Sequence, residues 1–201
     1  MIRKLLIVMV IVLSGCTTSP PSDVNDICSI FKEKKGWYKD ADKASDRWGS
    51  PIPVMMAIMH QESRFKAKAK PPRKKILWVI PGPRPSSSYG YTQALTATWD
   101  AYIRDAGNYG ADRDDFGDSV DFVGWYNHQS YKRSGIKKDD PYHLYLAYHE
   151  GWGGFNKRTF KNKQWLKDVS KKVSRNSARY TKQLQGCESD LKKGGGFFGL
   201  F

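Results

Sequence analysis

Apolar side chains recur every three or four positions along most of this 201-residue chain, and that spacing predicts amphipathic α-helices. Ser50-Pro51 is also a helix start signal, because a capping hydroxyl precedes a proline at the first helical position. The pattern predicts six helices, over residues 37–48, 52–62, 95–106, 119–126, 141–148 and 166–184. The predicted fold class is therefore mostly α.

Residues 70–88 interrupt the helical pattern. Their prolines, a short apolar run at 76–80 and three serines at 86–88 predict a loop with room for a small β-hairpin. No repeat and no long linker divides the rest of the chain, so a single domain is expected over residues 36–187. The glycine-rich end predicts a flexible tail over residues 188–201.

The N-terminus has the composition of a secretion signal. A basic pair at positions 3 and 4 precedes about ten apolar residues, too few for a permanent transmembrane helix. The run ends in Leu-Ser-Gly-Cys16, which resembles the lipobox of bacterial lipoproteins. That resemblance implies a signal peptide over residues 1–15 and diacylation of Cys16. The alternative is an ordinary signal peptide with a chance cysteine.

Thr17, rather than an aspartate, follows the lipobox cysteine. In lipoproteins this implies passage to the outer membrane, with the protein anchored by lipid in the inner leaflet and facing the periplasm. Residues 16–35, which begin with a stretch rich in Ser, Thr and Pro, are then expected to form a lipidated tether. Cys28 and Cys187 remain, and an oxidising periplasm favours a disulfide between them, although two unpaired thiols stay possible.

The chain carries a formal charge of +14, concentrated toward its C-terminal part. Such an excess predicts anionic partners. The secretion signal argues against nucleic acid and favours envelope polyanions, such as peptidoglycan carboxylates or lipopolysaccharide phosphates. A basic, solvated helix face is the simpler explanation, and the two are compatible.

Glu62 is the first candidate for chemistry, because it extends the apolar stripe formed by Met55 and Met59 on its helix. A carboxyl that emerges from such a stripe is partly desolvated, which raises its pKa toward the range of a general acid. Spacing alone, however, favours an ordinary exposed glutamate at the end of a helix.

Three short segments change that balance. Residues 60–65, His-Gln-Glu-Ser-Arg-Phe, contain Glu-Ser-x-Phe; residues 90–94 read Gly-Tyr-Thr-Gln-Ala; and residues 147–151 read Ala-Tyr-His-Glu-Gly. In this order they resemble the Glu-Ser-x-Phe, Gly-Leu-Met-Gln and Ala-Tyr-Asn-x-Gly motifs of the soluble lytic transglycosylase (SLT) family. The resemblance covers roughly residues 36–160 and implies a monomeric, lysozyme-like domain with a groove for peptidoglycan glycan strands.

The resemblance also implies roles for individual residues. Glu62 matches the catalytic acid/base, and Tyr148 matches the tyrosine that hydrogen-bonds the catalytic carboxyl. The remaining groove candidates, which would bind or orient substrate, are Ser63, Gln93, Tyr91 and Ser88, although spacing does not distinguish Ser88 from Ser86 and Ser87 as the groove serine. The implied reaction cleaves the MurNAc-β-1,4-GlcNAc bond and closes a 1,6-anhydro ring on MurNAc, so one carboxylate suffices where most glycosidases use two.

The sequence departs from the family at several points. Thr92 and Tyr91 replace the methionine and leucine, His149 replaces the asparagine, and the stretch before Gln93 is longer by roughly a dozen residues. Histidine and cysteine spacings fit no zinc site, so no metal and no cofactor are expected. The alternatives are a goose-type-like muramidase that hydrolyses the same bond, a non-catalytic peptidoglycan-binding lipoprotein, and a polybasic DNA- or lipopolysaccharide-binding protein.

Overall fold

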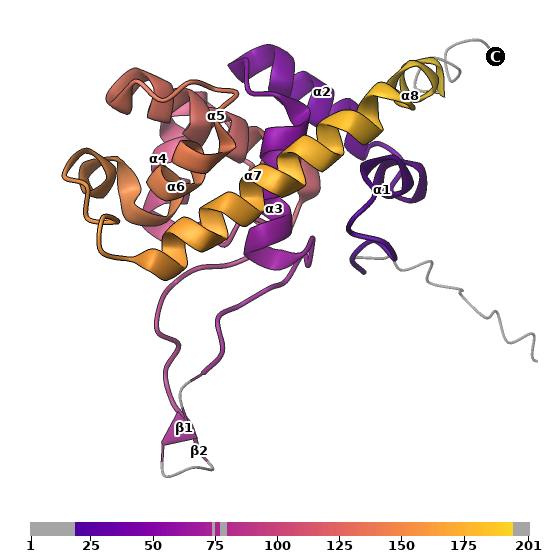
Figure 1. Ribbon diagram of the computed structural model, residues 1–201. Coiled ribbons are helices and arrows are strands. Elements are labelled where there is room, and N and C mark those ends of the chain that lie inside the picture. Colours follow the sequence, from indigo (N-terminus) through magenta and orange to yellow (C-terminus); the bar gives the residue numbers. More distant parts are fainter. Residues whose placement is uncertain (1–18, 74, 77–79, 195–201) are drawn as a thin grey trace, which may run out of the picture.

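The structure, a computed structural model, describes residues 19–73, 75–76 and 80–194 (Figure 1). Its described part is mostly helical, as the sequence predicts. The helices are α1 (Ile27–Glu33), α2 (Trp37–Trp48), α3 (Ile52–Ser63), α4 (Thr96–Ala106), α5 (Phe116–Ser134), α6 (Pro141–Asn156), α7 (Gln164–Gln185) and α8 (Glu188–Gly194). In this part of the chain no helix is both long and apolar enough to span a membrane.

Helix α3 forms the centre of the core. Every residue from Ile52 to His60 is buried, and a helix that is apolar around its whole circumference must be enclosed by neighbours. Helices α2, α5, α6 and α7 surround it. Helix α5 approaches both α2 and α3 closely because Gly124 has no side chain: a Cβ there would lie 2.8 Å from Cδ1 of Trp48 on α2 and 3.3 Å from Sδ of Met55 on α3. The surrounding helices hold α3 rigidly, and α3 carries Glu62.

Helix α7 lies diagonally across one face of the bundle (Figure 1). Its Tyr180 hydroxyl lies 2.8 Å from Nδ1 of His60, which ties α7 to α3. Burial is the main reason that the pKa of His60 falls to about 4, so this imidazole stays neutral inside the core. Helix α7 therefore packs directly against the end of α3 and supports it.

Helices are also present outside the predicted domain, on both sides of residues 36–187. Helix α1 lies within the predicted tether, and its Ile27, Ile30 and Phe31 are buried. The predicted disulfide is present, since Cys28 and Cys187 are joined and fasten α1 to the end of α7. Helix α8 occupies the first residues of the predicted tail. Residues 1–18, with Cys16, and 195–201 lie outside the described part of the chain.

The 70–88 segment leaves the body as a long arm, which contains the predicted hairpin (Figure 1). Strands β1 (Lys75–Ile76) and β2 (Ile80–Pro81) pair antiparallel, with Lys75 opposite Pro81 and Ile76 opposite Ile80. The two ends of the arm return to the body beside the end of α3, so the base of the arm lies next to Glu62.

Candidate active site

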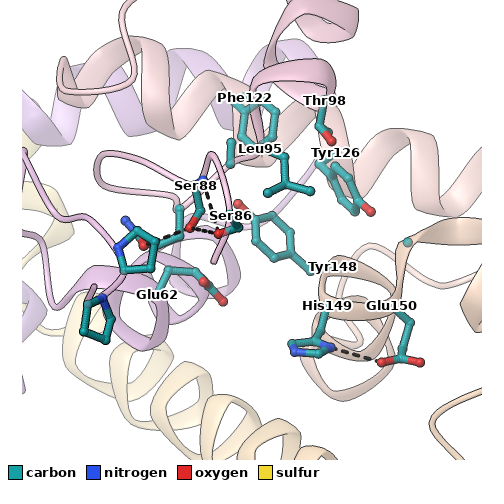
Figure 2. Close-up of a pocket in the computed structure, with 15 residues that line it drawn as sticks. Glu62, Ser86, Ser88, Leu95, Thr98, Phe122, Tyr126, Tyr148, His149 and Glu150 are labelled. Atoms are coloured by element: carbon teal, nitrogen blue, oxygen red, sulfur yellow. Dashed lines mark hydrogen bonds and ion pairs between the residues drawn. The ribbon is translucent and has the colours of Figure 1, made fainter. Parts of the chain in front are cut away.

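A groove of about 600 Å³ opens at the C-terminal end of α3 (Figure 2). Its walls come from the base of the arm, the turn before α4, one face of α5 and the second half of α6. The lining residues are Glu62, Pro71, Pro72, Ser86, Ser88, Gln93, Ala94, Leu95, Thr98, Phe122, Tyr126, Tyr148, His149, Glu150 and Gly151. Four of the predicted site residues, Glu62, Ser88, Gln93 and Tyr148, therefore line one groove.

Glu62 lies in the last turn of α3, and its carboxyl points into the groove (Figure 2). The helix stops immediately afterwards, because Arg64 and Phe65 both have positive φ angles of 53° and 59°. Left-handed conformations are costly for side chains of this size, so the fold must enforce the turn. Phe65 is fully buried, and its packing provides that enforcement.

The surroundings of Glu62 favour its protonated form. Burial raises the pKa of Glu62 to about 7, and a hydrogen bond from Tyr145 opposes part of this rise. A carboxyl with such a pKa is available both as a proton donor and, once ionised, as a proton acceptor near neutral pH. This behaviour is what a residue that must act first as acid and then as base requires.

Two tyrosines of α6, Tyr145 and Tyr148, lie close to Glu62, and the hydroxyl of Tyr148 bonds elsewhere. The Tyr148 hydroxyl donates to the Thr92 carbonyl oxygen at 2.7 Å, whereas Tyr145 is the tyrosine that lowers the pKa of Glu62. Both tyrosines project from α6 one turn apart, so they face the same side of the helix. Tyr148 instead holds the turn before α4 against α6, and among the described residues it makes no hydrogen bond to Glu62, contrary to the prediction.

The prediction that Tyr91 lines the groove is also wrong. Its ring is buried and packs edge-on against Trp37 and Phe116, with centroid distances of 5.6 Å and 5.9 Å. It therefore belongs to the core and does not line the groove.

Ser63 lies directly behind the groove wall. Its buried hydroxyl donates to the Tyr91 carbonyl oxygen at 2.7 Å. Ser63 thus connects the end of α3 to the turn that carries Gln93, a positioning contact away from the groove surface.

Gln93 and Ser88 stand on the wall formed by that turn. The Gln93 side-chain amide donates to the carbonyl oxygens of Ala69 and Gly90, both at 3.0 Å. Ser88 lies 2.9 Å from the Ser86 hydroxyl and donates to Oε1 of Gln93 at 3.5 Å. The amide is therefore fixed by backbone carbonyls on either side of the arm, and the serine hydroxyls face the groove.

Glu150, which the sequence argument did not select, is a second carboxylate on the groove wall. Its side chain is only 4% exposed, and Lys163 contacts its two oxygens at 2.8 Å and 2.9 Å. Burial alone would raise its pKa, but hydrogen bonds from Lys163, Thr159 and His149 outweigh burial and lower the pKa of Glu150 to about 2. Next to it, Gly151 interrupts α6 with a φ of 70° and a ψ of 160°, a conformation essentially restricted to glycine.

A family model described as a transglycosylase SLT domain matches residues 4–187. The chain belongs to this family. The match confirms the resemblance seen in the sequence motifs and the lysozyme-like helical fold, and it supports lytic transglycosylase action on peptidoglycan at the level of the family. No curated protein matches the chain. In this SLT domain the three motifs converge on one groove: α3 brings Glu62, the turn before α4 brings Gln93, and α6 brings Tyr148.

Proposed function

We propose that this SLT domain cleaves the MurNAc-β-1,4-GlcNAc bond of peptidoglycan with Glu62 as the only acid/base and releases a 1,6-anhydro-MurNAc end. The observation that carries the proposal is the state of Glu62: it lies in a groove of glycan-binding size with a pKa of about 7 and no cation among the causes of its shift. Such a group can give and take a proton without a partner carboxylate.

The reaction proceeds in two proton transfers. Protonated Glu62 donates its proton to the glycosidic oxygen, the bond from this oxygen to C1 of MurNAc breaks, and the substrate's own N-acetyl oxygen stabilises C1. The Glu62 carboxylate then removes the proton of the C6 hydroxyl, whose oxygen bonds to C1. Glu62 ends protonated, as it began. Tyr145 stabilises the carboxylate between the two transfers through its hydrogen bond.

Glu150 bears on the hydrolytic alternative. A muramidase that activates water needs a second carboxylate with a free oxygen. Both oxygens of Glu150 are occupied by Lys163, and Thr159 and His149 bond to the same carboxylate. This arrangement favours closure of the anhydro ring over hydrolysis.

The site of action is part of the proposal. We infer that Cys16 carries the lipid anchor and that the monomeric domain faces the periplasm from the outer membrane, a location that suits the disulfide between Cys28 and Cys187. Cys16→Ser is expected to move the protein from the membrane fraction to the soluble fraction. Unchanged membrane association of that variant would contradict lipid anchoring.

The decisive experiment compares wild type, Glu62→Gln and Asp139→Asn on purified sacculi. Asp139 is exposed, so its variant is a matched control for loss of one negative charge. We expect Glu62→Gln to lose about 10³-fold or more in release of soluble fragments, within the range for removal of a general acid. Mass spectrometry separates the products, because an anhydro end is lighter than a hydrolysed end by one water.

Three outcomes would contradict the proposal. Equal release by wild type and Glu62→Gln removes the catalytic role of Glu62. Products with a reducing MurNAc end favour the muramidase. Binding of sacculi without any release favours the non-catalytic lipoprotein.

A further inference from the structure

A second pocket, of about 390 Å³, lies beside the groove. Its lining residues are Lys70, Arg84, Ser86, Ser87, Ser88, Tyr89, Thr96 and Arg113. Ser86 and Ser88 belong to both spaces, so a ligand in this pocket would be a direct neighbour of a glycan strand in the groove. Figure 2 shows these two serines projecting toward Glu62 from the end of the arm.

Three cations from separate segments of the chain meet in the pocket. Lys70 Nζ lies 5.1 Å from the centroid of the Tyr89 ring, and the Arg113 guanidinium lies 5.3 Å from it. Arg113 donates through one nitrogen to the carbonyl oxygens of Ser87 and Ala94, both at 3.0 Å. Arg84 donates to the Pro71 carbonyl oxygen at the base of the arm. The fold thus fixes the positive groups around one opening.

Carboxylates do not neutralise this cluster within the described residues. None of the salt bridges between described residues involves Lys70, Arg84 or Arg113. Asp114, the residue after Arg113, accepts a hydrogen bond from the Tyr89 hydroxyl at 3.0 Å and does not line the pocket. The pocket therefore presents positive charge to any ligand that enters it.

The start of α4 adds to the positive charge around the pocket. Thr96 is the first residue of α4 and lines the pocket, and its N–H donates to the Ser87 hydroxyl at 3.1 Å. The N-cap residue of α4, Leu95, provides no side-chain cap, and the first turn of α4 has no acidic residue, whereas Asp115 caps α5. The start of α4 therefore adds partial positive charge, which favours an anion nearby.

We propose that this pocket, named here the stem pocket, binds a carboxylate of the peptide stem attached to a MurNAc in the groove. The proposal rests on the proposed function, because peptidoglycan is the polymer whose sugars carry such peptides. The stems provide the carboxylates of this polymer, and their attachment to the sugar puts them beside the strand. Arginine and lysine bind carboxylates with charge-assisted hydrogen bonds. The stem pocket makes this enzyme selective for glycan that still carries its peptides.

The test compares two substrates: sacculi with intact peptides, and glycan strands stripped of them by an amidase. The variant Lys70→Gln/Arg84→Gln removes two of the cations, and Lys70→Arg/Arg84→Lys retains both charges. Lys132→Gln/Lys137→Gln is the matched control, because these lysines are exposed at and after the end of α5, outside the stem pocket.

We expect wild type to cleave the peptide-bearing strands about tenfold faster than stripped strands at low substrate concentration, the worth of one or two charge-assisted hydrogen bonds. The Gln/Gln variant is expected to bring that ratio close to one, and the charge-retaining variant to restore most of it. The control variant keeps the wild-type ratio. Added salt should lower the ratio of the two rates, on peptide-bearing and on stripped strands, more in wild type than in the Gln/Gln variant.

The failure of this inference differs from failure of the proposed function. Equal ratios in wild type and the Gln/Gln variant would overturn the stem pocket while Glu62-dependent cleavage stands. Absence of cleavage of either substrate by wild type would overturn the proposed function itself.

Discussion

Glu62 and Glu150 line the same groove, one from the end of α3 and the other from α6, yet their carboxyls have different neighbours. Around Glu62 the main influence is burial, and Tyr145 provides one neutral hydrogen bond. Around Glu150 there are a lysine, a threonine hydroxyl and a histidine. The pKa of Glu62 rises to about 7, and that of Glu150 falls to about 2.

The difference teaches which carboxylate can do chemistry. Glu62 exchanges its proton near neutral pH and has access to the groove, so it suits a general acid and base. Glu150 is permanently charged and joined to Lys163, the residue that immediately precedes α7. Its ion pair fastens α6 to α7 and thereby holds the wall that carries His149. One glutamate is available to substrate, and the other stabilises the wall.

Removal of Lys163 is the strongest way to break this comparison. The variant Lys163→Met leaves the nearly inaccessible Glu150 carboxylate without its cation, and we expect a loss of about 3 kcal/mol in the free energy of unfolding at pH 7. This value is at the lower end of the losses seen when one partner of a buried ion pair is removed, because the Lys163 side chain is itself 41% exposed. Urea denaturation measures this loss.

Lys161→Met provides the control, because Lys161 is exposed and lies in the same loop. It should change the free energy of unfolding by less than about 0.5 kcal/mol. The double variant Lys163→Met/Glu150→Gln should recover part of the lost stability, since no buried charge then remains. A Lys163→Met protein as stable as wild type would show that Glu150 is not an anchor.

The second way to sharpen the comparison is the pH dependence of stability. The folded pKa of Glu62 lies above the unfolded value of 4.5, so Glu62 costs stability as pH rises from about 4.5 to 7. Glu62→Gln should therefore match wild type near pH 4 and be more stable above pH 7, by up to about 2–3 kcal/mol. Thermal and urea unfolding at both pH values measure the gap.

Glu150→Gln should behave in the opposite sense. The lowered pKa of Glu150 contributes stability that is present above pH 4.5 and is lost as pH falls toward 2. This variant should be less stable than wild type at neutral pH, and the gap should narrow in acid. If both variants shift stability in the same direction at neutral pH, the two carboxyls do not have the contrasting environments described.

The sequence predicts the long helices of the fold and not its short ones. All six predicted helices are present, because 11 to 22 residues give the apolar pattern enough turns to be recognised. Helices α1 and α8 have seven residues each, too few for periodicity to show, so the sequence predicts a tether and a tail for the segments that contain them. The disulfide was predictable from the count of cysteines and the compartment that the N-terminal sequence implies, without any knowledge of these helices.

The candidate site shows a similar limit. Motif order was enough to bring Glu62, Gln93 and Tyr148 to one groove. It could not show that Tyr145 takes the hydrogen bond to Glu62, because the choice between two tyrosines on one helix face depends on how α6 packs against α3. Nor could it pair Glu150 with Lys163, which lies 13 residues away beyond a break in the helix. Contacts between elements decide such details, and spacing within one element does not report them.

The smallest expected effect tests which tyrosine controls Glu62. The hydrogen bond from Tyr145 lowers the pKa of Glu62, so Tyr145→Phe should raise it. Because Glu62 must enter the reaction protonated, kcat/KM of wild type should fall as pH rises through about 7, and in Tyr145→Phe this fall should move upward by about 0.5–1 pH unit.

Tyr148→Phe is the matched comparison, since its hydroxyl donates to the Thr92 carbonyl oxygen instead. It should lower the rate by loosening the turn that carries Gln93, and the midpoint of the alkaline fall should remain where wild type has it. If the pH midpoint of the alkaline fall shifts in Tyr148→Phe and not in Tyr145→Phe, Tyr148 is the tyrosine that acts on Glu62. The pH midpoint, unlike the rate, distinguishes a direct bond to Glu62 from support of the wall, because only the direct bond changes how tightly Glu62 holds its proton.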